Sequence, residues 1–245
     1  MELKVSILTV AFNSEKTITK TIESVLRQTY SNIEYIIIDG LSTDNTVTIA
    51  KSYMEQFQNV GKSLTVISEK DQGMYDALNK GALLAQGQLI GQINSDDWYE
   101  DNAVEEMVKL FKRTAYDIAW ADIRIIKPSG ISIKKAKVNK LWFTAGFCHP
   151  SMFSRREVLL KYPYACREID DDFDMVTRAY RDGVKIETLN RVISNYVFGG
   201  MSTEKSIEKM KKRIQMKYST YRRNGFPAIY YFYCVAMETA KYLMG

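Results

Sequence analysis

The chain has 245 residues, of which 46% are hydrophobic and 26% are charged, and its formal net charge at pH 7 is +5. This is an ordinary globular composition, so collagen-like, disordered and low-complexity proteins are excluded, and the chain is long enough to bury a core without disulfide bonds. Cys148, Cys166 and Cys234 are widely spaced and form no CxxC pair, which argues against a disulfide framework or a structural zinc site.

Strand and helix patterns alternate through the first hundred residues. Short apolar runs predict strands at residues 5–11, 33–38, 64–68 and 89–93. Apolar side chains that recur every three or four residues predict helices over residues 15–28, 44–57, 74–85 and 102–112. Continuous apolar strands separated by helices indicate βαβ units. We therefore expect an α/β fold with a mostly parallel, Rossmann-like sheet that carries helices on both faces.

The pattern changes after residue 115. Residues 116–126 and 131–135 flank the turn sequence Lys127-Pro128-Ser129-Gly130, which predicts a β-hairpin. Two helices and then two strands are predicted at residues 155–161, 171–181, 185–189 and 192–197. The Gly199-Gly200 pair ends the compact region.

The positive charge is concentrated near the C-terminus. Residues 1–200 hold 25 basic and 26 acidic side chains, whereas residues 201–245 hold nine basic and three acidic ones. We therefore expect one domain over residues 1–203 and a basic, aromatic helical tail over residues 204–245. In one interpretation the apolar stripe of the tail packs on the domain, and in the other the tail binds an anionic membrane surface. Nucleic-acid binding is disfavoured because the domain itself is not basic.

Targeting and spanning segments are not expected. The N-terminal apolar run is too short for a signal peptide, and no run reaches 18 apolar residues. Together with the isolated cysteines, this favours a cytoplasmic protein, which the tail would hold peripherally on the inner face of the plasma membrane.

Acidic side chains follow several of the predicted strands. Asp39 follows the second strand, Asp96 and Asp97 follow the fourth, and residues 170–174 hold four more carboxylates. Ligands of open α/β sheets bind at the carboxyl ends of the strands, although Asp also makes turns and caps helices there. Adjacent carboxylates repel each other unless a cation binds, and oxygen-only ligands favour Mg²⁺ or Mn²⁺. The segment around Asp96 and Asp97 is therefore a candidate metal and phosphate site.

Several segments together carry a family resemblance. The chain resembles the nucleotide-sugar half of a family 2 glycosyltransferase of GT-A fold in VSILTVAFNSEKTITKTIESVLRQTYSNIEYIIIDGLSTDNT and SEKDQGMYDALNKGALLAQGQLIGQINSDDWY. It resembles the acceptor half in FCHPSMFSRREV, DDDFDMVTRAYRDG and FGGMST. The bacterial members that build O-antigen, capsule and exopolysaccharide are the most similar. The resemblance covers residues 3–203, and it implies a nucleotide-sugar half over residues 1–100 and an acceptor half over residues 101–203.

The resemblance implies a donor site in the first half. Ser95-Asp96-Asp97 occupies the family's DxD position, which implies that Asp97 binds the metal and that Asp96 lies near the donor ribose or the metal. Ser95 replaces the first Asp of the motif, and Gly40 follows Asp39 where many relatives have a second acid. Asp39 is expected to read uracil, and the alternative for Asn79 is a solvent-exposed helix position. The implied substrate-binding residues are Ala11, Phe12, Asn13, Asp39, Asp71, Tyr75, Asp76, Asn79, Lys80, Asn94, Ser95 and Asp96.

The second half supplies the implied acceptor site. Asp172 aligns with the family's general base, and the run of neighbouring carboxylates favours proton uptake by one of them. Asp170 or Asp171 is expected to cap the helix that begins there, and Asp171 is also placed among the substrate-binding residues.

Three further residues are implied to face the acceptor. His149 aligns with an acceptor-side histidine, although a lone histidine is more often a structural hydrogen-bonding group. Trp120 and Asp122, placed after the fifth strand, are expected to face the acceptor as well.

The sequence therefore predicts an inverting, Mn²⁺- or Mg²⁺-dependent glycosyltransferase. It is expected to move a hexose from a nucleotide-diphosphate sugar, UDP-linked in our interpretation, to a saccharide on a polyprenyl diphosphate lipid in bacterial surface polysaccharide synthesis. A catalytically inactive sugar-nucleotide-binding protein is the alternative, and a basic-tail nucleic-acid-binding protein is less favoured. A dinucleotide-dependent oxidoreductase is disfavoured because no GxGxxG follows the first strand. The oligomeric state is left open.

Overall fold

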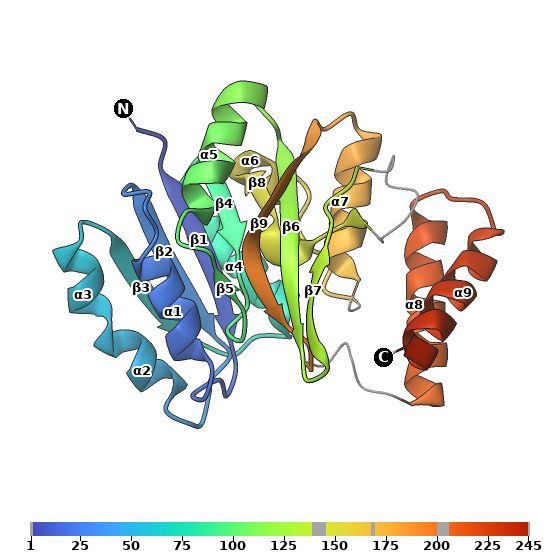
Figure 1. The fold of residues 1–245 in the computed structure, drawn as a ribbon, viewed down its shortest axis with the longest axis horizontal. Coiled ribbons are helices and arrows are strands. Elements are labelled where there is room, and N and C mark those ends of the chain that lie inside the picture. The colour runs from blue at the N-terminus through green and yellow to red at the C-terminus, as the bar shows by residue number, and fades with distance from the viewer. Residues whose placement is uncertain (1, 139–145, 168–169, 200–205, 245) are drawn as a thin grey trace.

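A single mixed sheet of nine strands organises the computed structural model, which describes residues 2–138, 146–167, 170–199 and 206–244 (Figure 1). The four N-terminal strands pair in parallel, as predicted. Ala11, Asp39 and Ser68 lie side by side at the carboxyl ends of three of them. The four strands are β1 (Val5–Ala11), β2 (Ile33–Asp39), β3 (Ser63–Ser68) and β4 (Leu89–Gln92).

The other five strands extend the sheet beyond β4 with mixed pairing. They are β5 (Trp98–Tyr99), β6 (Ile118–Lys127), β7 (Gly130–Lys134), β8 (Phe153–Arg155) and β9 (Ile186–Val197). β8 is antiparallel to both β4 and β6, whereas β9 is parallel to β6. The β6–β7 hairpin is confirmed. β5 and β8 are absent from the sequence-based prediction, and the two strands predicted at 185–189 and 192–197 form one strand with an irregular register opposite Ala121 and Asp122.

Alternate side chains of the strands enter two separate hydrophobic cores because successive residues of a strand point to opposite faces. In β2, Tyr35 and Ile37 enter one core, whereas Ile36 and Ile38 enter the other. The first core is covered by α1 (Ile18–Leu26), α2 (Thr46–Ser52), α3 (Met54–Asn59) and α5 (Ala103–Thr114), and the second by α4 (Met74–Leu84), α6 (Arg156–Lys161) and α7 (Asp171–Arg181). Helices on both faces are thus confirmed, although the single helix predicted over residues 44–57 is two helices that meet at Tyr53.

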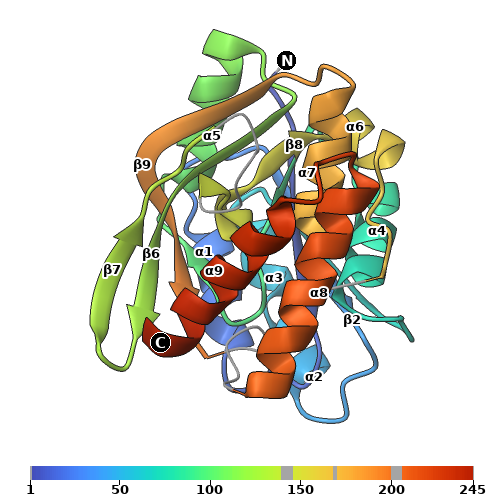
Figure 2. The same ribbon diagram turned by 90° about the vertical axis from the view of Figure 1, so that its right-hand side faces the viewer.

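The basic tail folds as two helices, α8 (Ile207–Arg223) and α9 (Tyr230–Met244). They pack against each other at one end of the molecule, beside α7 (Figure 2). The ring of Tyr221 is fully buried and lies 5.5 Å from that of Phe173 in α7, between ring centroids. The buried apolar side chains of α8, Ile214 and Tyr221, therefore pack on the domain, as one of the two interpretations expects. Among the helices of the described ranges, none is both long enough and apolar enough to cross a membrane.

Candidate active site

The segment after β4 is held against the loop after β1. The Ser14 and Ser95 hydroxyl oxygens lie 2.8 Å apart, and the Thr21 hydroxyl donates a hydrogen bond of 2.6 Å to the backbone carbonyl of Asp97. The carbonyl of Asn94 accepts from the amide of Asp97 at 3.1 Å, which closes a tight turn. The parallel pairing of β1 and β4 thus brings two predicted site segments together at one edge of the sheet.

Asp97 is a buried carboxylate with one unsatisfied oxygen. The short strand β5 follows it and pairs with β9, and this pairing aligns the Val197 amide to donate to Asp97 Oδ1 at 2.9 Å. Oδ2 is buried and has no hydrogen-bond partner. Burial and the neighbouring charge of Asp96 raise the pKa of Asp97 to about 8, and burial also raises the pKa of Asp96. Such a carboxylate is poorly stabilised by the protein alone.

These surroundings fit a divalent cation that takes most of its ligands from substrate. A hard cation would supply the positive charge that Asp97 Oδ2 lacks. In the described ranges, no three side chains of His, Cys, Asp or Glu gather into a metal-binding group. Mg²⁺ and Mn²⁺ sites that act on nucleotides commonly use one or two carboxylates together with phosphate oxygens and water. The donor set is therefore compatible with the predicted metal, with Asp97 as its protein ligand and Asp96 beside it.

Asp39 is fully buried at the end of β2 and is already a hydrogen-bond acceptor. Its Oδ2 accepts from the Ser42 amide at 2.9 Å and from the Ser68 hydroxyl at 2.6 Å, and Oδ1 accepts from the Ser42 hydroxyl. An ionised carboxylate offers about four acceptor positions, so room remains for one more donor. Its role in reading uracil stays a prediction.

The loop after β1 borders Asp39. Ala11 is buried beside it, and the ring of Phe12 is exposed and available to stack on a planar base. Asn13 has a positive φ of 49° and accepts from the Thr43 amide at 2.9 Å through Oδ1. These three residues thus form a rigid turn next to Asp39.

Asp71 lies against the end of β2 because Gly40 has no side chain. A Cβ atom at position 40 would lie 2.6 Å from Asp71 Oδ2. The other carboxylate oxygen, Asp71 Oδ1, accepts from the Gly73 amide at 2.8 Å. Asp71 therefore lies beside Gly40, so a second carboxylate is present near the strand end even though position 40 is glycine.

Asn79 and Lys80 bind other parts of the protein. The Asn79 amide accepts from the Tyr164 backbone amide and donates to the Tyr164 carbonyl, both at 2.9 Å, so solvent exposure does not describe it. Lys80 donates to the Lys70 carbonyl at 2.7 Å and pairs with Glu69 at 2.9 Å and with Asp76 at 3.5 Å. These side chains hold the loops around the site, and their contact with a donor stays a prediction.

Tyr75 packs against Tyr164 and is influenced by the charge of Asp172 in α7. Its buried ring lies 5.0 Å from that of Tyr164, whose hydroxyl donates to Gln92 Oε1 at 2.7 Å. Burial and the charge of Asp172 raise the pKa of Tyr75 well above its ordinary value. Neither Tyr164 nor Gln92 was predicted as a site residue from the sequence. A buried glutamine at the end of an apolar strand is the one local sign that Gln92 has a polar partner.

The four carboxylates at the start of α7 have different partners. Asp171 Oδ2 accepts from the Arg167 amide at 2.5 Å. Asp174 accepts from Arg178 at 2.9 Å and from Asn224 at 2.7 Å. Asp170 is the N-cap residue, but its side chain makes no capping hydrogen bond, so the predicted side-chain cap at this position is wrong. Asp171 instead accepts from the backbone of Arg167, which precedes the helix.

Asp172 faces the only histidine of the chain. His149, in a single turn of 3₁₀ helix (His149–Ser151), places Nδ1 3.1 Å from Asp172 Oδ2. The two side chains are 12% and 17% exposed, respectively, so both are shielded but accessible at the surface of the site. The Phe173 amide donates to Asp172 Oδ1 at 2.7 Å. This arrangement gives a carboxylate that a backbone amide orients, beside the imidazole of His149.

Trp120 and Asp122 lie within β6 and are both fully buried, so their predicted position after a strand is wrong. The Trp120 indole donates to the Gly146 carbonyl at 2.7 Å. Asp122 accepts from Lys135 at 2.7 Å and from the Ala136 amide at 2.8 Å. Both side chains therefore bind other parts of the protein, and their contact with an acceptor stays a prediction.

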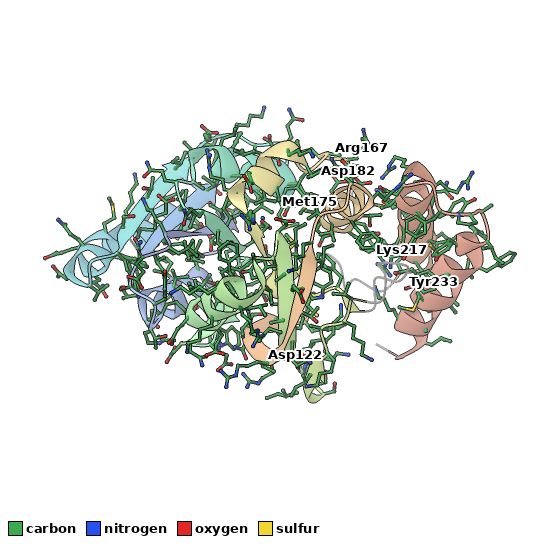
Figure 3. All side chains as sticks on the ribbon, turned by 90° about the horizontal axis from the view of Figure 1, so that it is seen from above. Asp122, Arg167, Met175, Asp182, Lys217 and Tyr233 are labelled. Atoms are coloured by element: carbon green, nitrogen blue, oxygen red, sulfur yellow. The ribbon has the colours of Figure 1, made fainter. Side chains whose placement is uncertain are left out.

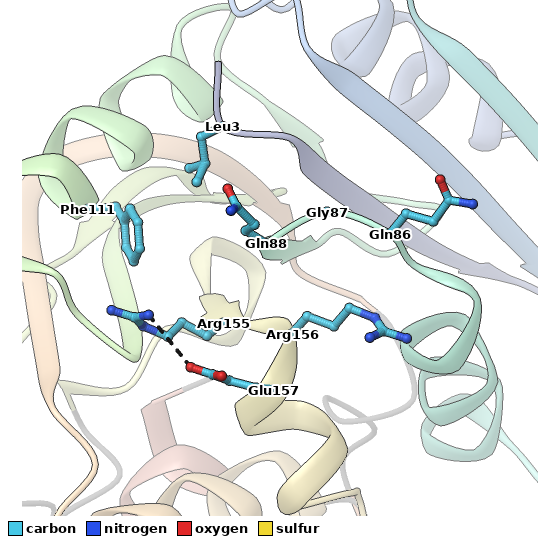
Figure 4. A pocket seen from close by; sticks show the side chains of 8 residues that line it. All are labelled: Leu3, Gln86, Gly87, Gln88, Phe111, Arg155, Arg156 and Glu157. Carbon is cyan, nitrogen blue, oxygen red and sulfur yellow. Dashed lines mark ion pairs between the residues drawn. The ribbon is translucent and has the colours of Figure 1, made fainter. Parts of the chain in front are cut away.

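A cavity of about 390 Å³ lies elsewhere, near the amino ends of β1 and β4 (Figure 4). Its lining includes an ion pair between Arg155 and Glu157 at 3.6 Å. No predicted site residue belongs to the lining, which comprises Leu3, Gln86, Gly87, Gln88, Phe111, Arg155, Arg156 and Glu157. It is therefore distinct from the carboxylate-rich edge.

Comparisons with known proteins agree with this architecture. The model of the family described as glycosyl transferase family 2 matches residues 6–167. A PGL/p-HBAD biosynthesis glycosyltransferase of Mycobacterium tuberculosis is 28% identical over 218 residues, which cover 86% of this chain and 84% of that protein. The putative glycosyltransferase EpsH of Bacillus subtilis is 36% identical over 105 residues, which cover 43% of this chain and 29% of that protein.

Solved structures share the fold. The structure of S. aureus TarS 1–349 in complex with UDP has a TM-score of 0.71 at 16% identity and covers 99% of this chain and 72% of its own. The mannosyltransferase PcManGT from Pyrobaculum calidifontis, in complex with GDP-Man and Mn²⁺, has a TM-score of 0.70 at 16% identity, covering 98% of this chain and 74% of its own. At this identity the likeness concerns the fold alone, and it matches the predicted GT-A architecture.

Proposed function

Because the chain belongs to glycosyl transferase family 2, we propose that it is an inverting, metal-dependent enzyme that moves a hexose from UDP to a lipid-linked saccharide. The observation that carries this proposal is a pair of carboxylates in contrasting surroundings. Asp97 is buried with one unsatisfied oxygen, and Asp172 is partly exposed beside His149. The first suits the charge of a leaving diphosphate with its cation, and the second suits a hydroxyl that must lose a proton.

In the proposed mechanism Asp172 is the general base. It takes the proton from the acceptor hydroxyl as the oxygen attacks the anomeric carbon from the face opposite the diphosphate, which inverts that centre. His149 Nδ1 lies 3.1 Å from Asp172 Oδ2 and places a polar group next to the carboxylate where the acceptor hydroxyl would approach. When bound, the cation on Asp97 would stabilise negative charge on the departing diphosphate.

The nucleotide in the proposal is UDP. Phe12 provides an exposed ring for base stacking, and Asp39 has acceptor capacity left for a ring N–H of uracil. Structures of the same fold are described in complex with UDP, UDP-GlcNAc and GDP-Man. The ligands of these structures support a sugar-nucleotide donor, whereas the choice of UDP rests on Asp39 and Phe12.

Calorimetric titration tests the donor site directly. We expect UDP to bind the full chain in the presence of Mn²⁺ and at least about tenfold more weakly after chelation, because the cation links the diphosphate to Asp97. GDP under the same conditions is the matched control and is expected to bind more weakly. If GDP binds better than UDP, the nucleotide assignment is wrong. If no nucleotide binds, the transferase site itself is wrong.

We also propose that the tail holds the protein on the cytoplasmic face of an anionic membrane, where a polyprenyl diphosphate acceptor would be found. The side chains of Ile229, just before α9, and of Phe232 and Leu243 on α9 are 69%, 71% and 75% exposed. On α8, Lys211 and Lys212 are exposed. Apolar side chains that enter the interface and lysines that contact lipid headgroups are the two elements of a peripheral anchor. Lys217, by contrast, is buried and is not available to lipid.

Vesicle sedimentation tests the anchor. The variant Lys211→Gln/Lys212→Gln is expected to bind phosphatidylglycerol vesicles roughly 30-fold more weakly, since each lysine contributes about 1 kcal/mol near an anionic surface. Phe232→Ser is expected to weaken binding further because it removes an apolar side chain from the interface. Leu83→Ser, at a position 67% exposed on the domain, is the control and should leave sedimentation unchanged. Equal sedimentation of all variants would place the anchor outside the tail.

A further inference from the structure

A buried cluster of charges lies between the two tail helices and the domain. Glu238 of α9 is 1% exposed, and it accepts from Lys217 of α8 at 2.5 Å and from Arg213 at 3.0 Å. Lys241 donates to the same carboxylate at 3.2 Å. These cations hold the pKa of Glu238 at about 2 against the opposing effect of burial. Three cations around one carboxylate exceed what is needed to neutralise it, so a second acid is expected nearby.

The second acid is Asp170, at the N-terminus of α7. Burial raises its pKa to about 6, and the charge of Lys217 opposes that shift. For Lys217, burial lowers the pKa, but the charges of Asp170 and Glu238 outweigh it and the pKa is raised. Lys217 is 4% exposed and lies on the side of α8 that faces the body of the molecule (Figure 3). The buried ammonium group of Lys217 therefore pairs with Glu238 of the tail, and its charge also acts on Asp170 in the first turn of α7.

The inner face of α8 matches the first turn of α7 along its length. Lys217, Tyr221 and Asn224 recur at intervals of four and three residues and are all buried. Tyr221 packs on the ring of Phe173, and Asn224 donates to Asp174 at 2.7 Å. These residues thus contact α7 at the two positions that directly follow Asp172 in the sequence, and Asp172 itself faces His149.

We propose that Lys217 is a positioning residue, buried beside Glu238 on the face of α8 that packs on α7, whose charge holds the first turn of α7 so that Asp172 points at His149. The role in catalysis rests on the proposed function of Asp172, whereas the packing of α8 on α7 does not. Without the lysine, the charged groups acting on Asp170 are Asp172, Glu238 and Lys241, and Glu238 keeps Arg213 and Lys241 as partners. Asp170 would then lose its strongest attractive charge while the charge of Asp172 remains, and the first turn of α7 would move to separate these two carboxylates.

The chain contains its own reporter for this movement, since His149 is its only histidine. The imidazole ¹H–¹³C signal of the tag-free full chain, recorded at one fixed pH, therefore needs no assignment. We expect Lys217→Met to shift this signal and Lys217→Arg to restore it to the wild-type position. Lys212→Met, which removes the same charge from an exposed position of the same helix, should leave it unchanged.

A double-mutant cycle tests whether the effect passes through Asp170. Asp170→Asn removes the charge that Lys217 faces, so Lys217→Met is expected to cause little further shift in that background. Donor turnover, measured as UDP release, should fall by about 10- to 100-fold in kcat for Lys217→Met, with KM for the donor unchanged. A folded Lys217→Met protein with the wild-type His149 signal would overturn the proposal. If that variant does not fold, a wild-type His149 signal in folded Lys217→Gln would overturn it equally.

The two proposals fail in different ways. A shifted His149 signal in Lys217→Met, together with full turnover in Asp172→Asn, would support the effect of Lys217 on the first turn of α7 and reject Asp172 as the base. An unshifted signal together with an inactive Asp172→Asn protein would reject the positioning role and keep the base.

Discussion

Asp172→Asn is expected to lower kcat for sugar transfer by about 10²- to 10⁴-fold, the usual contribution of a positioned general base. Asn is the same size and still accepts from the Phe173 amide through Oδ1, so the turn should persist. It cannot take a proton from the acceptor hydroxyl. UDP binding with Mn²⁺ should stay within a few-fold of wild type, because the proposed nucleotide contacts lie at the carboxyl ends of β1, β2 and β4.

The matched control for this variant is Asp182→Asn. Asp182 follows the same helix at its other end and accepts from the Tyr162 hydroxyl at 2.6 Å, so its replacement weakens a hydrogen bond far from the proposed chemistry. It should retain most of the turnover. Parallel loss of UDP binding and turnover in Asp172→Asn would mean that Asp172 is structural. Absence of turnover in the wild-type protein despite UDP binding would favour the catalytically inactive sugar-nucleotide-binding alternative.

Asp97→Asn is expected to have opposite effects on binding and on stability. Loss of the carboxylate should weaken Mn²⁺-dependent UDP binding by at least about 100-fold, more than the 10- to 100-fold typical for residues that only support a metal ligand. The metal-free variant should nevertheless unfold at a higher temperature at pH 8, by about 2–4 °C for each kcal/mol gained in a chain of this size. Asn keeps the acceptor for the Val197 amide and removes a buried charge.

The pH dependence gives the sign of this stability effect. The pKa of Asp97 in the folded protein is raised to about 8 from an ordinary value of 3.8. A carboxyl group with a raised pKa favours folding while it is protonated, and that contribution is lost as the pH rises towards 8. The stability gain of Asp97→Asn should therefore grow between pH 5 and pH 8 without metal. Asp101→Asn, at an exposed carboxylate that pairs with Arg27 at 3.4 Å, should show no such trend. A lower unfolding temperature with metal-dependent UDP binding intact would identify Asp97 as a structural residue.

The N-terminal half of the fold was predictable because its signals are local. Three of its four strands, β1, β2 and β4, are short, mostly apolar runs buried on both faces, and short connections to helices force parallel pairing. The later strands depend on partners that are distant in sequence. β5 and β8 have two and three residues, which are too few for any period to be recognised. The irregularity in β9 is set by its register with β6.

For the site, the sequence identified residue types and missed their environments. The run from Asp170 to Asp174 predicts an acidic turn, but nothing local distinguishes its members. The carboxylates are distinguished by their partners, which are Arg167, Arg178, Asn224 and Lys217. The last two lie more than 40 residues away in the sequence. Lys80 shows the converse, because a lysine in a donor-binding segment looks available until its partners Glu69 and Asp76 are seen.

Positions 40 and 71 are coupled through one close approach. Gly40 leaves room for a carboxylate that approaches from the loop after β3, and a Cβ atom at position 40 would lie 2.6 Å from Asp71 Oδ2. Because Asp71 Oδ2 is the end of a flexible side chain, a larger residue at position 40 would turn that carboxylate aside and leave the strand end in place. Substitutions at the two positions are therefore expected to have non-additive effects on stability and on donor binding.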